Sequence, residues 1–169
     1  MSLTASLRVS FKGRQTGAND IAAQDFSPEI TKLLEFANGT GANQADLLFV
    51  DERTIAASGS EEIDLAGSLS DAFGATITAA EVVGLLVVAD AGNTNDVVVG
   101  GAASNAFVGP FAAADNTVSV GPGGIFAIFS PDASGIGTVT ASTGDLLKVA
   151  NSSSGTGVTY KLAVLARSA

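Results

Sequence analysis

Short apolar segments rich in β-branched residues recur along this chain of 169 residues. Each segment is bounded by Gly, Pro, Asn, Asp or Ser, which are the residues that tight turns favour. Between these segments lies no stretch of helical length with apolar side chains three or four positions apart. Roughly ten short strands at this spacing predict an all-β protein, an antiparallel β-sandwich of jelly-roll type.

The densest apolar stretch of the chain covers residues 79–111. Within it, the run 82–88 is too short to cross a bilayer and is typical of a strand that is buried on both faces. Residues 90–96 supply Gly, Asn and Asp, which tolerate turn geometry, and 97–99 begin a second strand. We expect these two strands to pair as a β-hairpin at the centre of the protein.

The first residues alternate strictly between apolar and polar side chains, which is the period of a half-buried strand. The polar set is basic because it includes Arg8 and Lys12, and Arg14 follows shortly after it. The segment lacks the apolar core and the small-residue cleavage site of a secretory signal. The alternating apolar residues are Leu3, Ala5, Leu7, Val9 and Phe11.

The segments that follow this strand are less distinctive. Residues 13–24 are expected to form a loop or an extended arm, and 27–37 fit either a helix begun by Pro28 or a strand. We predict a short helical turn at 69–73 and a strand at 107–112. The chain divides into an N-terminal strand and arm, 1–45, and a β-sandwich domain, 46–169, with the arm either part of the same domain or swapped between subunits.

The composition limits the partners of the protein. Only 15% of the residues are charged, against about 25% in ordinary soluble domains, so we expect part of the surface to be covered. The net charge of −9 lies entirely beyond residue 40, because four basic and four acidic side chains balance before it. An acidic surface repels phosphate, so nucleic acid is not an expected partner. A membrane is not expected either, because no apolar run approaches about 20 residues.

The chemistry of the side chains argues against an enzyme. His and Cys are both absent, which removes the usual acid–base group near neutral pH, the commonest metal ligand and thiolate chemistry. The acid pairs at 51–52 and 61–62 point to opposite faces of a strand, so a glycosidase site is not expected. Loop acids lack the spacing of a calcium loop and are better explained as turn formers. We predict no catalytic residue, no cofactor and no metal site. The loop acids are Asp90, Asp96, Asp115, Asp132 and Asp145.

Five segments between about residues 38 and 165 share short strands separated by turns of small residues. They read GTGANQADLLFVDERTIAASGSEEIDLAG, LSDAFGATIT, NTNDVVVGGAASNAF, VGPGGIFAIFSPDA and TGDLLKVANSSSGTGVTYKLAVL. In these segments the chain resembles small structural proteins encoded among the virion genes of tailed bacteriophages. The resemblance implies a non-enzymatic building block, present in many copies, whose contact surfaces are its function.

From this resemblance we expect a capsid decoration or cement protein that binds the outer shell as a homo-oligomer, with a trimer favoured. The expected partners are the major capsid protein or other virion proteins, and the expected location is the virion, after synthesis in the host cytoplasm. Candidate docking contacts are Arg8, Lys12 and Arg14 on the basic strand face. The alternatives are a tail or head-fibre component and a receptor- or carbohydrate-binding β-sandwich. An aromatic content of 6%, almost all Phe, argues against sugar binding.

Overall fold

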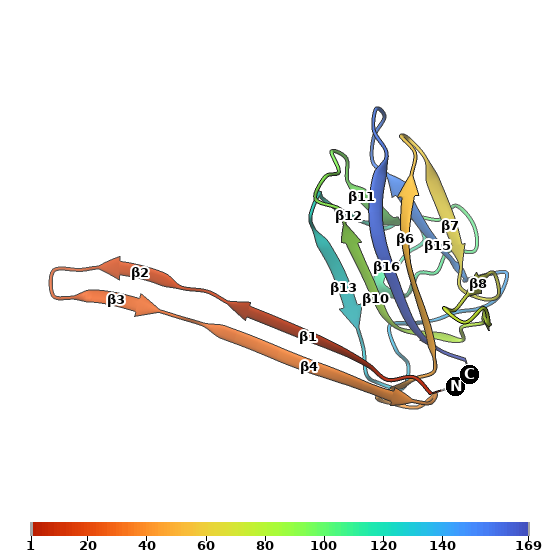
Figure 1. Ribbon diagram of the computed structural model, residues 1–169, viewed down its shortest axis with the longest axis horizontal. Coiled ribbons are helices and arrows are strands. Elements are labelled where there is room, and N and C mark those ends of the chain that lie inside the picture. Colours follow the sequence, from red (N-terminus) through yellow and green to blue (C-terminus); the bar gives the residue numbers. More distant parts are fainter. Residues whose placement is uncertain (1, 169) are drawn as a thin grey trace.

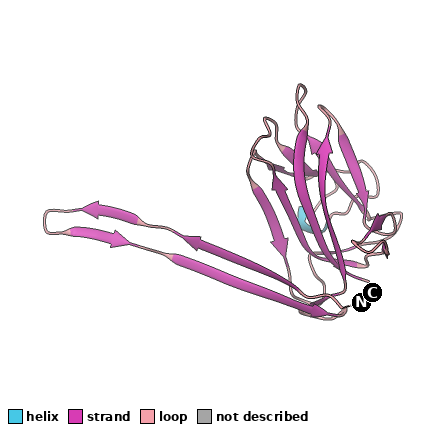
Figure 2. Cartoon of the chain, in the orientation of Figure 1, coloured by secondary structure: helices cyan, strands magenta, loops and turns pink. Residues whose placement is uncertain are grey.

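The computed structural model describes residues 2–168 and divides them into a β-sandwich body and a long two-stranded arm (Figure 1). Strands make up nearly all of the regular structure, and a short 3₁₀ turn, η1 (Gly109–Phe111), lies in the body (Figure 2). The prediction of an all-β fold is confirmed.

Eight strands build the body as two antiparallel sheets. Their bounds are β6 (Leu47–Ile55), β7 (Ser60–Asp64), β10 (Glu81–Ala89), β11 (Val97–Gly100), β12 (Thr117–Val120), β13 (Ile125–Phe129), β15 (Leu146–Asn151) and β16 (Val158–Arg167). The first sheet has the order β13-β10-β16-β6, with β14 (Gly137–Thr138) also beside β10, and the second has the order β12-β11-β15-β7. The first and last of the eight strands are therefore neighbours, and every connection except β11–β12 passes from one sheet to the other, as in a jelly roll, which confirms the predicted sandwich type.

The core lies between the two sheets. It is filled by the side chains at every second position of each strand, which point inward. In β16, Val158, Tyr160 and Leu162 point inward and are fully buried, while Lys161 between them is exposed. In β15, Leu147 and Val149 are buried in the same way from the opposite sheet. This alternation of buried and exposed side chains is the sequence pattern from which the strands were predicted.

The expected central hairpin does not form, because β10 and β11 lie in different sheets. β10 pairs with β13 and β16, whereas β11 pairs with β12 and β15. Residues 90–96 therefore carry the chain from one layer to the other. In this crossing, the side-chain amide of Asn93 makes the pair of hydrogen bonds that a neighbouring strand would make. Its Nδ2 donates to Thr159 O at 2.8 Å, and its Oδ1 accepts from Thr159 N at 2.8 Å.

Two local predictions in the body are wrong. Within the strand predicted at 107–112, Gly109–Phe111 form the 3₁₀ turn, because Pro110 has no N–H to give to a strand ladder. The helical turn expected at 69–73 is instead the hairpin of β8 (Leu69–Ser70) and β9 (Thr76–Ile77). Asp71 stabilises its turn, since Asp71 Oδ1 accepts from Phe73 N and Ala75 N, each at 2.9 Å.

The arm is one antiparallel ribbon made of two strand pairs in a continuous register. β1 (Ala5–Lys12) pairs with β4 (Glu29–Asn38), and β2 (Gln15–Ala18) pairs with β3 (Ala23–Phe26). Thus 27–37 is a strand and 13–24 an extended arm, which settles both open alternatives. Figure 1 shows the ribbon leading away from the body. At its root, β5 (Gln44–Ala45) pairs in parallel with the end of β4.

Candidate functional site: the arm and the outer face of the first sheet

Four large apolar side chains share one side of the arm, whereas Leu33, opposite Arg8, lies on the other side. Residues directly opposite each other in an antiparallel pair point to the same side, so Phe11 and Ile30 lie together, as do Gln15 and Phe26. We call Val9, Phe11, Phe26 and Ile30 the apolar arm face. Their exposed fractions are 50%, 59%, 65% and 67% in that order, so the half-buried strand expected from the alternation lacks the surface that would bury it.

The other side of the arm carries the sequence-predicted docking contacts Arg8, Lys12 and Arg14. It is not a basic face, because β3 and β4 bring acids to it. Lys12 Nζ lies 3.2 Å from Glu29 Oε1, and Arg14 Nε lies 3.0 Å from Asp25 Oδ2. Exposed ion pairs of this kind contribute about 0–1 kcal/mol each. A docking role for the three basic residues stays a prediction, and the structure adds the apolar arm face as a second candidate.

The root of the arm is held by an apolar cluster on the outside of the first sheet. Phe36, at the end of the ribbon nearest the body, is 3% exposed and packs with Val83 of β10 and Leu165 of β16. Its ring centroid lies 6.4 Å from that of Phe129 in β13. The ribbon therefore leaves the body from a fixed point, although its distal two thirds are exposed.

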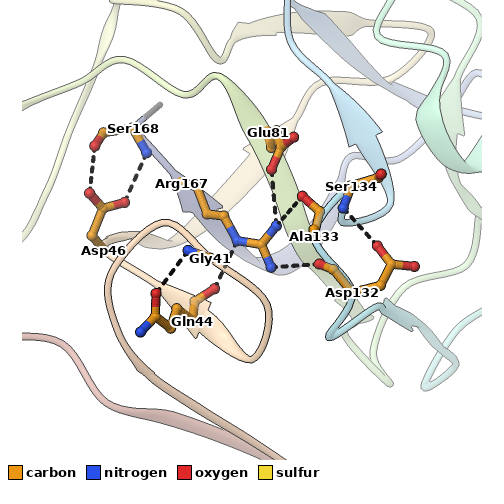
Figure 3. Close-up of polar contacts among 9 residues, drawn as sticks. All are labelled: Gly41, Gln44, Asp46, Glu81, Asp132, Ala133, Ser134, Arg167 and Ser168. Carbon is orange, nitrogen blue, oxygen red and sulfur yellow. Dashed lines mark hydrogen bonds and ion pairs between the residues drawn. The ribbon is translucent and has the colours of Figure 1, made fainter.

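A buried arginine joins this root to the body (Figure 3). Arg167 at the end of β16 is 1% exposed, and its guanidinium forms an ion pair of 2.9 Å with Glu81 Oε2. The same group donates to Gln44 O at 3.0 Å, to Ala133 O at 2.8 Å and to Asp132 O at 2.7 Å. One side chain thus connects β5 after the arm, β10, β16 and the loop after β13.

The outer face of the first sheet is mainly apolar. Cross-strand register places Val50, Ala163, Leu86 and Ala127 in one row across the four strands. A second row is half charged and half apolar, and it consists of Glu52, Lys161, Val88 and Ile125. The row on the other side consists of Leu48, Leu165, Gly84 and Phe129. Val50 and Ile125 are 65% and 67% exposed. We call Leu48, Val50, Leu86, Val88, Ile125 and Ala127 the outer sheet face.

The outer face of the second sheet is polar by comparison. Its outward positions alternate with the buried residues of β7, β12 and β15, and most of them are charged or hydroxylated. They include Ser60, Glu62, Asp64, Thr117, Ser119 and Lys148. The outer face of the second sheet is therefore typical of a surface in contact with water, whereas the apolar outer face of the first sheet is typical of a covered surface.

A hollow of about 260 Å³ opens near one end of the first sheet. Val88 and Lys161 line it from adjacent strands, together with Glu52 and the loop residue Gly123. Binding sites for small molecules usually enclose about 300–1,000 Å³. The hollow is below that range, and it lies beside the outer sheet face.

The polar side chains around the buried Tyr160 are paired with one another. Tyr160 Oη donates to Glu61 Oε1 at 2.7 Å, and Glu61 Oε2 lies 2.7 Å from Arg53 Nη2. Arg53 also contacts Asp51 Oδ2 at 2.9 Å. Burial, followed by the hydrogen bond and the charge of Glu61, raises the pKa of Tyr160 far above its usual value. Glu52 points to the opposite side, toward Lys161, so the acid pair at 51–52 is split as expected.

The loop acids lie apart, and several serve as acceptors within turns. Asp90 Oδ1 accepts from Gly92 N at 2.7 Å, Asp132 Oδ1 from Ser134 N at 2.8 Å, and Asp145 Oδ2 from Ser142 N at 2.6 Å. Over residues 2–168, His, Cys, Asp and Glu side chains do not gather in groups of three or more that could hold a metal ion.

Comparisons of the chain with models of protein families, with curated proteins and with solved structures found no significant match. Within residues 2–168 no helix has the length and apolar character needed to span a membrane. The likeness to bacteriophage structural proteins therefore stays a prediction from the sequence.

Proposed function

We propose that this protein is a structural subunit of a multi-copy particle, and that it decorates the outer shell of a tailed-bacteriophage capsid. The observation that carries the proposal is an arm whose apolar side chains extend into solvent, away from the body (Figure 1). A two-stranded ribbon is marginal in water without a surface to lie on. An exposed apolar arm is therefore a device for binding a neighbour.

The buried polar groups support a structural role in place of catalysis. Tyr160 and Arg167, the two largest side chains that are fully buried, are engaged by Glu61 and Glu81. Each serves to join strands: Tyr160 connects the two sheets, and Arg167 connects the arm root to the first sheet. The jelly-roll fold is also frequent among capsid proteins, which is an argument by analogy of fold and does not by itself assign a function.

The mechanism that we propose is stabilisation by binding. A protein that binds the assembled shell and not its free subunits stabilises the assembly, by about 2.7 kcal/mol per site at a free concentration 100 times its dissociation constant. Repeated over a lattice, this contribution raises the temperature at which the shell opens.

Particles prepared with and without the protein test the proposal by their heat resistance. We expect bare particles to open at a lower temperature, and added protein to restore the higher one. The double variant F11E/I30E places two charges on the apolar arm face and is expected not to bind. Its matched control, S10E/T31E, places the same charges on the neighbouring residue pair, which faces the other side of the ribbon. Equal heat resistance of both particles, with no added density on the lattice, would contradict the proposal.

A tail or head-fibre component is the second candidate, and the elongated outline given by the arm favours it. The copy number per particle separates the two roles. A decoration protein occupies every equivalent position on the shell, whereas a fibre or tail component is confined to one vertex or to a few attachment points. Labelled protein distributed evenly over the shell supports decoration, and label at one vertex supports the second role.

A further inference from the structure

We infer that the apolar arm face of one copy lies on the outer sheet face of a second copy, so that the subunits are joined by exchanged arms. This inference rests on the proposed structural role and deepens it by naming a partner for the arm. The two surfaces belong to the same chain, and each is exposed in a single copy. Because the ribbon leads away from its own body, it leaves its own outer sheet face uncovered (Figure 1).

Both surfaces carry the same chemistry at similar exposure. Phe11 and Ile30 on the arm are 59% and 67% exposed, and Val50 and Ile125 on the sheet are 65% and 67% exposed. Burying apolar area contributes in proportion to the area removed from water. Contact between these two surfaces would bury both sets at once.

The asymmetry of the sandwich shows which side receives the arm. On the second sheet the outward positions include Glu62, Lys148 and Ser119, which are charged or polar. On the first sheet the central row is Val50, Ala163, Leu86 and Ala127. Only the first sheet offers an apolar ribbon a row of apolar side chains that crosses all four strands.

The dimensions of the two surfaces agree. From Val9 to Gln15, opposite Phe26, the apolar arm face is about 20 Å long at a rise of about 3.4 Å per residue. Four strands spaced about 4.8 Å apart give the outer sheet face a width of about 14 Å. The ribbon can therefore cross all four strands, and the hollow of about 260 Å³ beside Val88 can seat one aromatic ring from it.

Charge favours contact between arm and body over contact between two bodies. The body carries the whole net charge of −9, whereas the first 40 residues are neutral. Two bodies therefore repel each other, but a neutral arm approaches a body without that cost. Lys32 lies opposite Val9 on the contact side of the arm, and Glu52 at the rim of the outer sheet face forms an ion pair of 3.7 Å with Lys161, so Lys32 would meet an acid that it shares with Lys161.

Symmetry then limits the arrangement. The arm face and the sheet face are different surfaces, so their contact is heterologous and must close into a ring or a reciprocal pair to avoid an open filament. A ring of three copies, each arm lying on the next body, is the arrangement that we expect.

The molar mass of the purified full-length protein in light scattering tests the inference. We expect an oligomer, and at least about tenfold weaker self-association for F11E/I30E and for V50E/I125E. Two controls carry the same added charge: S10E/T31E on the other side of the arm, and S60E/T117E on the outer face of the second sheet. Both controls should associate like the unchanged protein, and circular dichroism should show that all four variants remain folded.

Cross-linking identifies the contact directly, because the chain has no cysteine of its own. I30C and V50C are made in separate preparations, mixed and treated with a short bis-maleimide. We expect a covalent pair of copies from this mixture and much less from I30C mixed with S119C. A monomer at all concentrations, or an oligomer that F11E/I30E and V50E/I125E leave intact, would overturn the inference.

The two proposals fail separately. If the protein is monomeric but F11E/I30E abolishes its binding to particles, the arm docks on another virion protein, and arm exchange is wrong while the decoration role stands. If the arms cross-link as expected but added protein leaves the heat resistance of particles unchanged, arm exchange stands and the decoration role is wrong.

Discussion

The ring of Phe129 lies directly against the backbone of Gly84, on the outer surface of the first sheet. The two residues are paired across β10 and β13, and a Cβ atom at Gly84 would overlap the ring. Phe129 in turn contacts Phe36 at the root of the arm. The absence of a side chain at one position of β10 is therefore what allows the arm to be anchored.

The substitution G84A should displace Phe129 and loosen the arm root. We expect a loss of about 1–3 kcal/mol in the free energy of unfolding, which urea titration measures, because overpacking forces neighbouring side chains to move. G17A in the arm is the matched control, since a Cβ atom there meets nothing within 4 Å. F129A should cost less in the G84A background than alone, because the two residues interact. Equal stability of G84A and G17A would contradict the role of this contact.

Arg167 should be the most important polar side chain for the stability of the arm root. R167M keeps the apolar stem but leaves Glu81 and the carbonyls of Gln44, Asp132 and Ala133 without their donor, the buried guanidinium. We expect a loss of about 3 kcal/mol or more in the free energy of unfolding. R14M removes an exposed ion pair with Asp25 and should cost about 0–1 kcal/mol. Similar losses for the two variants would show that the buried network contributes no more than an exposed pair.

Asn93 should stabilise the crossing between the two sheets. N93A removes both hydrogen bonds to Thr159 and is expected to lower the free energy of unfolding by about 1–3 kcal/mol. N93D keeps an oxygen that accepts from Thr159 N but loses the donor to Thr159 O, so its stability should lie between those of N93A and the unchanged protein. An N93A variant as stable as the unchanged protein would mean that the backbone alone fixes this crossing.

The local pattern of apolar and polar residues was enough to predict most strands of the body. It did not predict which strands are neighbours in a sheet. Residues 82–88 and 97–99 are strands as expected, but no local signal shows that their partners are β16 and β15. The turn at 90–96 has the composition of a hairpin turn, and a crossing between sheets uses the same residues. Pairing is decided by contacts between residues far apart in the chain.

The arm shows the same limit. The alternation through Val9 and Phe11 predicts one apolar face, but it does not say whether the same chain covers that face. The expected basic face was lost because Glu29 lies in the segment that fits either a helix or a strand, and Asp25 lies in β3, a strand that the sequence did not predict. The outer sheet face was also hidden, since recognising Val50, Leu86 and Ile125 as neighbours requires the register of four strands.

Tyr160, the single tyrosine of the chain, makes the interior of the sandwich accessible to an alkaline titration. Burial and Glu61 raise its pKa above the ordinary value of 10.0, so the folded protein keeps the phenol protonated at a pH where the unfolded chain ionises. The contribution of this residue to stability is therefore fully present below about pH 10 and is lost as the pH rises above it.

We expect no tyrosinate absorption from the folded protein above pH 10 until circular dichroism shows that it unfolds. Y160F lacks the hydrogen bond to Glu61 and should be less stable by about 1–2 kcal/mol at pH 7. The difference between the two proteins should narrow above pH 10, because only the unchanged protein has a phenol that ionises on unfolding. Titration of Tyr160 near pH 10 in the folded state would mean that water reaches the phenol. The hydrogen bond from Tyr160 to Glu61 would then not connect the two sheets.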